Sequence, residues 1–189
     1  ETTVQSADSY FLKMKGLAQG WKWLLGLSDF AFYFVQIAYY GAQPANATPV
    51  LFSGGWDADT RLQQANAMAL PHAGMASAVD LGISNDYHPT DKLDVGERLA
   101  LWALKNDYGR TTLVTSGPIL RDVAVSGNKA ICAFDYVGSG LMVGSKTPYQ
   151  PTRETNAPLA LFSIAGTNGT WYWATATIVG DTVELTSPS

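Results

Sequence analysis

Residues 74–109 read GMASAVDLGISNDYHPTDKLDVGERLALWALKNDYG, and this segment gives the clearest signal of the fold. The run from Gly74 to Leu81 is short and apolar, which predicts a strand, and Gly82 to Pro89 forms a polar loop. A helix is expected next, with Thr90 as its cap and Gly109 as its stop. Its apolar stripe comprises Val95, Leu99, Trp102 and Ala103.

The sequence upstream repeats this alternation of helix and strand. We expect a helix over residues 6–25 capped by Ser6, then a strand from Phe30 to Ala38 that is apolar on both faces, as in buried parallel sheets. A long loop over 39–56 and a helix over 57–68 complete this part. Three helices interleaved with two strands predict an α/β fold with parallel strands.

The downstream part is punctuated by tight turns. Gly and Asn lie between apolar runs at residues 126–129 and 167–170, and Gly180-Asp181 precedes the last run, which is typical of β-hairpins because these residues tolerate positive φ. We therefore expect an α/β part over residues 1–110 and an antiparallel β-sandwich over residues 111–189.

The composition excludes several classes of protein. The chain has 189 residues, 47% of them hydrophobic and 15% charged, and a net charge of −4. This apolar content excludes disorder, and the lack of a basic excess argues against nucleic acid as a partner. The longest apolar stretch, Phe30 to Tyr40, is too short to cross a membrane, and Cys132 has no second cysteine to pair with. Few charges and many aromatic, Thr, Ser and Gly residues favour a secreted or periplasmic glycan-handling protein.

Only His72 and His88 supply imidazoles. His72 precedes the expected strand and is interpreted as a loop or surface residue. His88 lies in the loop that follows this strand, at the strand end where sites of α/β folds form. Asp86, two residues earlier, can accept the Nδ1 proton and hold the tautomer that a general base needs. An ordinary turn is the alternative interpretation of this Asp-x-His.

Other chemistry is not indicated. Two histidines and one distant cysteine have no zinc-binding spacing, and neither a G-x-S-x-G nor a G-x-G-x-x-G motif occurs, so we expect no metal and no cofactor. Trp171 and Trp173 share one face of an expected strand and Tyr172 faces the other way. These aromatic residues fit either a sugar-binding platform or packing in the core.

The segment over residues 74–109 and its surroundings also resemble a known family. The matching pieces are Gly74-Met75-Ala76, Val79-Asp80-Leu81-Gly82, His88-Pro89, Lys92, Val95 to Leu104, Tyr108-Gly109, the upstream Phe34 to Ala38, Trp56, Arg61 and Gln64, and the downstream Ser116-Gly117-Pro118, Phe134-Asp135 and Gly138 to Leu141. Together they resemble the last third of the sialate O-acetylesterase family of SGNH-type carbohydrate esterases.

This resemblance implies a fold and an activity. The fold would be the C-terminal part of an SGNH-type, flavodoxin-like α/β/α hydrolase domain followed by a jelly-roll-like β-sandwich. The activity would be serine-dependent removal of acetyl groups from carbohydrates, with His88 as the general base and Gln36 and Trp56 as candidate substrate-binding residues. Such enzymes often place an aspartate three residues before the histidine, where this chain has Asn85. Asp86, Asp80 or a backbone carbonyl therefore remain as alternatives for the group that orients the imidazole.

The family's nucleophile block lies upstream of the part that this chain matches. We therefore expect the N-terminal half of the same parent protein, as a separate chain, to supply the nucleophilic serine. The alternatives from other classes are a non-catalytic glycan-binding module built on the β-rich half and a degenerate esterase-like scaffold.

Overall fold

The computed structural model describes residues 9–41, 46–47, 58–86 and 88–187. It divides into two compact units. Among the described residues, the first unit holds 9–41 and 58–116, and the second holds 46–47 and 117–187. The first is a mixed α/β unit and the second consists of β-strands. The expected cap Ser6 and the candidate residue Trp56 lie outside the described residues.

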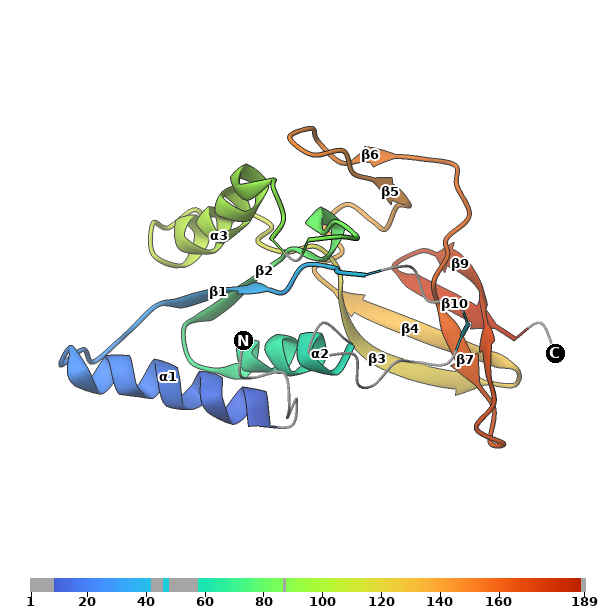
Figure 1. Cartoon of the computed structure of the whole chain (residues 1–189), viewed down its shortest axis with the longest axis horizontal. Helices are drawn as coiled ribbons and strands as arrows, with labels where there is room; N and C mark the ends of the chain where they lie inside the picture. Colours follow the sequence, from blue (N-terminus) through green and yellow to red (C-terminus); the bar gives the residue numbers. More distant parts are fainter. Residues whose placement is uncertain (1–8, 42–45, 48–57, 87, 188–189) are drawn as a thin grey trace. The chain divides into compact units, whose positions relative to one another are not determined.

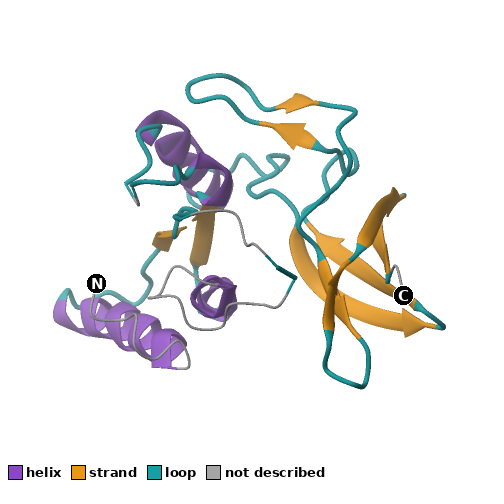
Figure 2. Ribbon diagram, turned by 45° about the vertical axis from the view of Figure 1, so that its right-hand side comes forward, coloured by secondary structure: helices purple, strands orange, loops and turns teal. Residues whose placement is uncertain are grey.

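The first unit is built on two parallel strands. Strand β1 (Phe32–Gln36) pairs with β2 (Ala73–Ser77) from Phe32↔Ala73 to Gln36↔Ser77, which confirms the expected parallel pairing. Helix α3 (Lys92–Asn106) covers one face of this pair, and α1 (Tyr10–Leu24) and α2 (Ala58–Asn66) lie on the other (Figures 1 and 2). The described part of this unit thus has three layers, helix on sheet on helix.

Packing of α3 on β2 depends on a glycine. The indole of Trp102 is buried, and its Nε1 donates a hydrogen bond to the carbonyl of Met75 at 2.9 Å. A Cβ built on Gly74 would lie 2.5 Å from the Trp102 ring, so only glycine admits the indole this close to the strand. A second cluster under the same helix buries Ala38, Ala78 and Leu81.

Two local expectations are corrected. The strand expected over residues 74–81 ends at Ser77, and Val79–Leu81 forms the 3-10 turn η4. The Ser77 carbonyl accepts from Arg98 at 2.6 Å instead of continuing a sheet ladder. The cap of α3 is Asp91 rather than Thr90, because the buried Asp91 carboxylate accepts the N–H of Asp94 at 3.1 Å. A further 3-10 turn, η3 (Ala67–Ala69), follows α2.

The second unit contains several antiparallel sheets. A four-stranded sheet has the order β3-β4-β10-β9, and β5 pairs with β6 and β7 with β8. The hairpins expected at 126–129, 167–170 and 180–181 form. The strand bounds are Ile119–Ser126 (β3), Lys129–Asp135 (β4), Gly144–Ser145 (β5), Arg153–Glu154 (β6), Ser163–Ala165 (β7), Trp171–Trp173 (β8), Thr175–Val179 (β9) and Thr182–Thr186 (β10).

The core of the second unit lies under β4 and β10. Its buried members are Ala130, Cys132, Val183 and Leu185. Burial raises the pKa of the Cys132 thiol, because a thiolate would lose its hydration there. Cys132 is a free cysteine that packs as a small apolar side chain.

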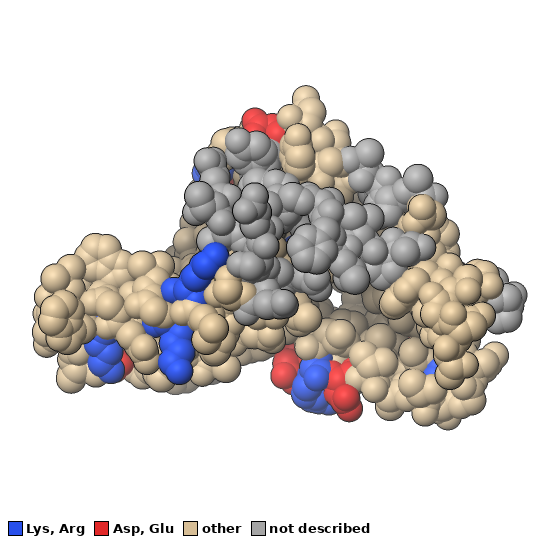
Figure 3. Space-filling view, turned by 60° about the horizontal axis from the view of Figure 1, so that its bottom comes forward, with Lys and Arg blue, Asp and Glu red and all other residues tan. Residues whose placement is uncertain are grey.

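Charged residues make up 15% of the chain. Among the described residues on the face drawn in Figure 3, the Lys and Arg side chains lie in small separate groups. No helix among the described residues has the length and apolar character that a bilayer span requires.

Candidate functional site

His88 and Asp86 are in contact. The Nδ1 atom of His88 lies 3.2 Å from Oδ1 of Asp86, in the loop between η4 and α3. The same Oδ1 accepts the backbone N–H of His88 at 2.8 Å, so the turn itself fixes the carboxylate beside the ring. Both side chains are exposed. An Nδ1 proton held by a carboxylate leaves Nε2 to accept a proton from a reactant, which is the arrangement a general base needs.

Asp80 has a different partner. The Arg98 guanidinium donates to both of its carboxylate oxygens, at 2.6 and 2.7 Å. This bidentate pair raises the pKa of Arg98, although burial opposes the shift. Of the two acids considered for the imidazole, the structure therefore places Asp86 at His88 and Asp80 on Arg98.

The carboxyl ends of the two strands carry a polar network. Gln36, the last residue of β1, donates from Nε2 to the Arg61 carbonyl at 3.0 Å. Its Oε1 accepts the hydroxyl of Ser77, the last residue of β2, at 2.8 Å. Both ends of the Gln36 amide thus join β1 to β2 and α2, which accounts for its position in the fold. Its suggested role in substrate binding remains a prediction.

A buried glutamine fixes the end of β1. The Gln64 carbonyl oxygen accepts the N–H of Ile37 at 3.0 Å, and its Nε2 lies 3.1 Å from the Tyr10 hydroxyl. Burial of this amide with its partners satisfied ties α1 and α2 to the strand end. Gln64 therefore supports the sheet edge from which the candidate site extends.

The loops that follow β1 and β2 lie against each other. The N–H of Gly41 donates to the Ser84 carbonyl at 3.2 Å. A Cβ on Gly82 would lie 2.1 Å from the Tyr39 carbonyl oxygen, so only glycine permits this approach of two backbones. The His88 loop is thus anchored at the carboxyl edge of the strands, where the position after a parallel strand predicted it.

The role of Arg98 in holding Asp80 was not predicted from the sequence. The available signal was the spacing of Asp94 and Arg98, four residues apart on one helix, with Asp80 before the loop. Within the described part of the chain, no group of three or more His, Cys, Asp and Glu side chains could hold a metal ion.

Comparisons with known proteins place these observations in context. A scan against models of known families finds no match, and a search of curated proteins finds none. Among solved structures, the chain is similar to a carbohydrate acetylesterase from Xanthomonas citri, with 31% sequence identity and a TM-score of 0.76. The similarity covers 98% of this chain and 39% of that one. It supports the coarser expectation, a mixed α/β chain similar to carbohydrate esterases.

Proposed function

We propose that this chain is the base-bearing part of a serine-type carbohydrate O-acetylesterase, with acetylated sialate or plant glycans as its substrates. The observation that carries the proposal is the His88–Asp86 contact in the loop after β2, in a chain that is similar to a carbohydrate acetylesterase. The first unit would belong to an SGNH-type α/β/α domain and the second to a β-sandwich. Acetylated glycans outside the cytoplasm fit the proposed secreted or periplasmic location.

The proposed reaction has two steps. A serine hydroxyl attacks the acetyl carbonyl, Nε2 of His88 takes the hydroxyl proton, and the sugar oxygen leaves with that proton. Water then attacks the acetyl-enzyme while His88 accepts a proton from it. His88 passes this proton to the serine oxygen as acetate is released, which restores the serine. Asp86 holds the Nδ1 proton throughout and favours the charged imidazolium that forms in each step.

A second polypeptide segment, the N-terminal half of the parent protein, would supply the serine. This chain spans 39% of the acetylesterase that it resembles, which leaves most of that chain unmatched. The first unit also has an exposed apolar surface on α1, where Leu17, Trp21 and Leu24 follow each other at helical spacing. An exposed apolar stripe of this kind on a helix is typical of a contact surface.

The test compares this chain alone with this chain joined to the rest of its parent reading frame. We expect 4-nitrophenyl acetate and acetylated xylan to be hydrolysed only by the joined protein, because a base without its nucleophile supplies little rate. Ordinary esterase turnover by this chain alone would show that the nucleophile lies within it. An inactive joined protein would favour the degenerate scaffold.

A glycan-binding module is the second candidate, and the β7–β8 hairpin favours it. Ile164 packs against the core of the second unit and pairs with Tyr172, so this face of the hairpin is the inner one. Trp171 and Trp173 lie on the opposite face and are 40% and 38% exposed. Both tryptophans are thus partly buried, as Tyr172 is at 37% exposure, and packing in the core remains the alternative interpretation.

Binding to glycans separates this candidate from the first. The pair of small residues opposite the indoles, Ala165 and Ser163, leaves them uncovered by the partner strand. Isothermal titration with xylan oligosaccharides should lose its signal in the Trp171→Ala Trp173→Ala double variant. Trp23→Ala, which removes an 84% exposed tryptophan on α1, is the matched control. Equal binding by both variants would exclude the platform.

A further inference from the structure

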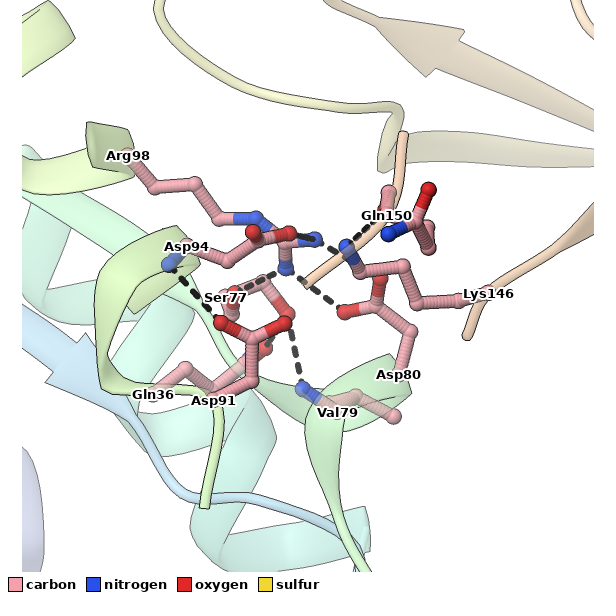
Figure 4. Close-up of polar contacts among 9 residues, drawn as sticks. All are labelled: Gln36, Ser77, Val79, Asp80, Asp91, Asp94, Arg98, Lys146 and Gln150. Atoms are coloured by element: carbon pink, nitrogen blue, oxygen red, sulfur yellow. Dashed lines mark hydrogen bonds and ion pairs between the residues drawn. The ribbon is translucent and has the colours of Figure 1, made fainter. Parts of the chain in front are cut away.

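Arg98 connects the two ends of the loop that carries Asp86 and His88. Its guanidinium points from α3 to the end of β2 (Figure 4), where it donates to the Ser77 carbonyl at 2.6 Å. It grips the Asp80 carboxylate before the loop, and its Nη2 lies 3.8 Å from Oδ2 of Asp94 after the loop. One side chain therefore contacts both segments that flank the loop, residues 77–82 before it and the start of α3 after it. These segments are called its stems below.

The chemistry of this contact suits arginine specifically. The planar guanidinium offers several donors in fixed directions, so it serves the Ser77 carbonyl and both Asp80 oxygens together. The Arg98 side chain is only 26% exposed, so water competes less for these charge-assisted bonds than at an open surface. A lysine would place one ammonium group there and lose the bidentate geometry.

Other contacts also hold the two ends of the loop. At the C-terminal end of the loop, Asp91 is buried and caps α3 by accepting the N–H of Asp94. At the N-terminal end of the loop, Gly82 lies against the Tyr39 backbone, and the Ser84 carbonyl accepts the N–H of Gly41. The Asp86–His88 turn lies between these anchors, and its hydrogen bond joins residues of the same turn. The position of the turn therefore follows the separation of the two stems.

We propose that Arg98 is a positioning residue for His88. It holds the 77–82 stem and the start of α3 at a fixed separation, and this keeps the imidazole in the orientation in which Asp86 accepts its Nδ1 proton. Arg98 touches no reacting atom. Its consequence for catalysis rests on the proposed function, whereas its effect on the imidazole can be measured without any activity.

Nitrogen NMR of this chain tests the proposal directly. With two histidines, the spectrum has two imidazoles, and His72 serves as the internal reference. At about pH 8.5, where imidazoles are largely neutral, we expect His88 of the unaltered chain to carry its proton on Nδ1. In Arg98→Met the proton should move towards Nε2, the form that free histidine prefers, and in Arg98→Lys the shift should be intermediate. His72 should be unchanged in both.

The controls separate positioning from general destabilisation. Arg121→Lys alters another Arg–Asp pair, with Asp135 at 3.0 Å in the second unit, and should leave the His88 signals unchanged. If Arg98→Met fails to fold, Asp80→Asn weakens the same grip while the Ser77 contact remains, and should produce a smaller shift in the same direction. Unchanged His88 signals in a folded Arg98→Met variant would overturn the proposal. If Arg98→Met does not fold, unchanged His88 signals in Asp80→Asn would overturn it.

Kinetics of the joined protein give the second measurement. Arg98→Met should lower kcat by roughly 10²-fold with little change in KM, because misplacing a base affects the chemical step more than binding. Arg98→Lys should recover part of this loss. If the joined protein has no esterase activity but the nitrogen signals shift as expected, the proposed function fails and the positioning role stands. An Arg98→Met enzyme with normal kcat would refute the catalytic part.

Discussion

The two histidines of this chain make nearly identical contacts at opposite ends of β2. His72 Nδ1 lies 3.1 Å from Asp29 in the loop before the strand, and His88 Nδ1 lies 3.2 Å from Asp86 in the loop after it. The two imidazoles are 55% and 68% exposed. Distance and exposure therefore do not distinguish a candidate catalytic pair from a structural one.

Their places in the fold do distinguish them. The His72–Asp29 contact joins segments far apart in sequence, and the His72 carbonyl accepts the N–H of Phe32 at 2.9 Å. This contact therefore closes the amino end of the sheet. The His88–Asp86 contact joins residues two apart, within a turn that Asp86 also holds through the backbone N–H of His88. The place of this pair after the carboxyl end of a parallel strand, where sites of α/β folds form, is the reason for the proposed role of His88.

Replacing each histidine gives the largest expected difference. In the joined protein, His88→Ala should lower kcat by several orders of magnitude with little loss of stability, because an exposed loop side chain contributes little packing. His72→Ala should leave kcat almost unchanged. Rates of acetate release from acetylated xylan check both variants. Near-normal deacetylation after His88→Ala would end the assignment, and a large loss with His72→Ala would reverse it.

The two aspartates should differ in the same direction. Asp86→Asn should lower kcat by up to about 10⁴-fold, the loss seen when the corresponding aspartate of a trypsin-type triad is changed to asparagine. Asp29→Asn should leave kcat unchanged. A mild effect of Asp86→Asn would show that a backbone carbonyl orients the His88 imidazole, since both Asp80 oxygens already accept hydrogen bonds from Arg98. Steady-state kinetics of both variants decide between these arrangements.

Much of this comparison was available from the sequence. The apolar run before His88 and the periodic helix after it predicted β2 and α3, and the pair of short-range partners followed from Asp-x-His. The acid could not be chosen in advance, because the choice depends on Arg98, which lies 18 residues beyond Asp80 and occupies it only in the folded chain. Local patterns indicate which groups can pair, and the fold decides which of them do.

Two other features, the cap of α3 and the inner face of β8, could not be predicted from the sequence for the same reason. Both Thr90 and Asp91 are good cap residues, and only the burial of Asp91 in the folded chain selects it. Alternation placed Trp171 and Trp173 on one face of a strand, but which face meets the core depends on Ile164 in the partner strand. The sequence predicts periodicity, whereas the direction of each face is a tertiary property.

A glycine substitution tests whether the carboxyl end alone supports the site. Gly82→Ala forces a Cβ against the Tyr39 carbonyl oxygen, so the free energy of unfolding should fall by about 1–3 kcal/mol. The NMR signals of His88 should move and those of His72 should not. Gly96→Ala in α3 is the matched control, because its Cβ meets nothing within 4 Å and alanine favours helices. Denaturant unfolding and the two imidazole signals provide the measurements, and equal responses of both histidines would contradict the comparison.

The smallest expected effect concerns the amino end, where Tyr33 donates a hydrogen bond to Asp107 at 2.8 Å. Burial first, and then the Asp107 carboxylate, raise the pKa of Tyr33 above its ordinary value of about 10. The folded chain therefore holds this proton more tightly than the unfolded chain. The stabilisation is fully present below about pH 10 and is lost as the pH rises through the folded pKa. Tyr33→Phe should cost about 1 kcal/mol at neutral pH and remove this part of the alkaline decline.

Denaturant unfolding at about pH 7 and about pH 11 measures this difference, with Tyr172→Phe in the second unit as the control. Unfolding should be followed by a probe of the first unit, because the two units need not unfold together. Acetate release by the joined protein at neutral pH should not change in Tyr33→Phe, since the contact lies at the His72 end of the sheet. An unaltered alkaline decline would show that Tyr33 does not contribute to it. A loss of kcat would show instead that the amino end reaches the site, and the contrast between the two histidines would fail with it.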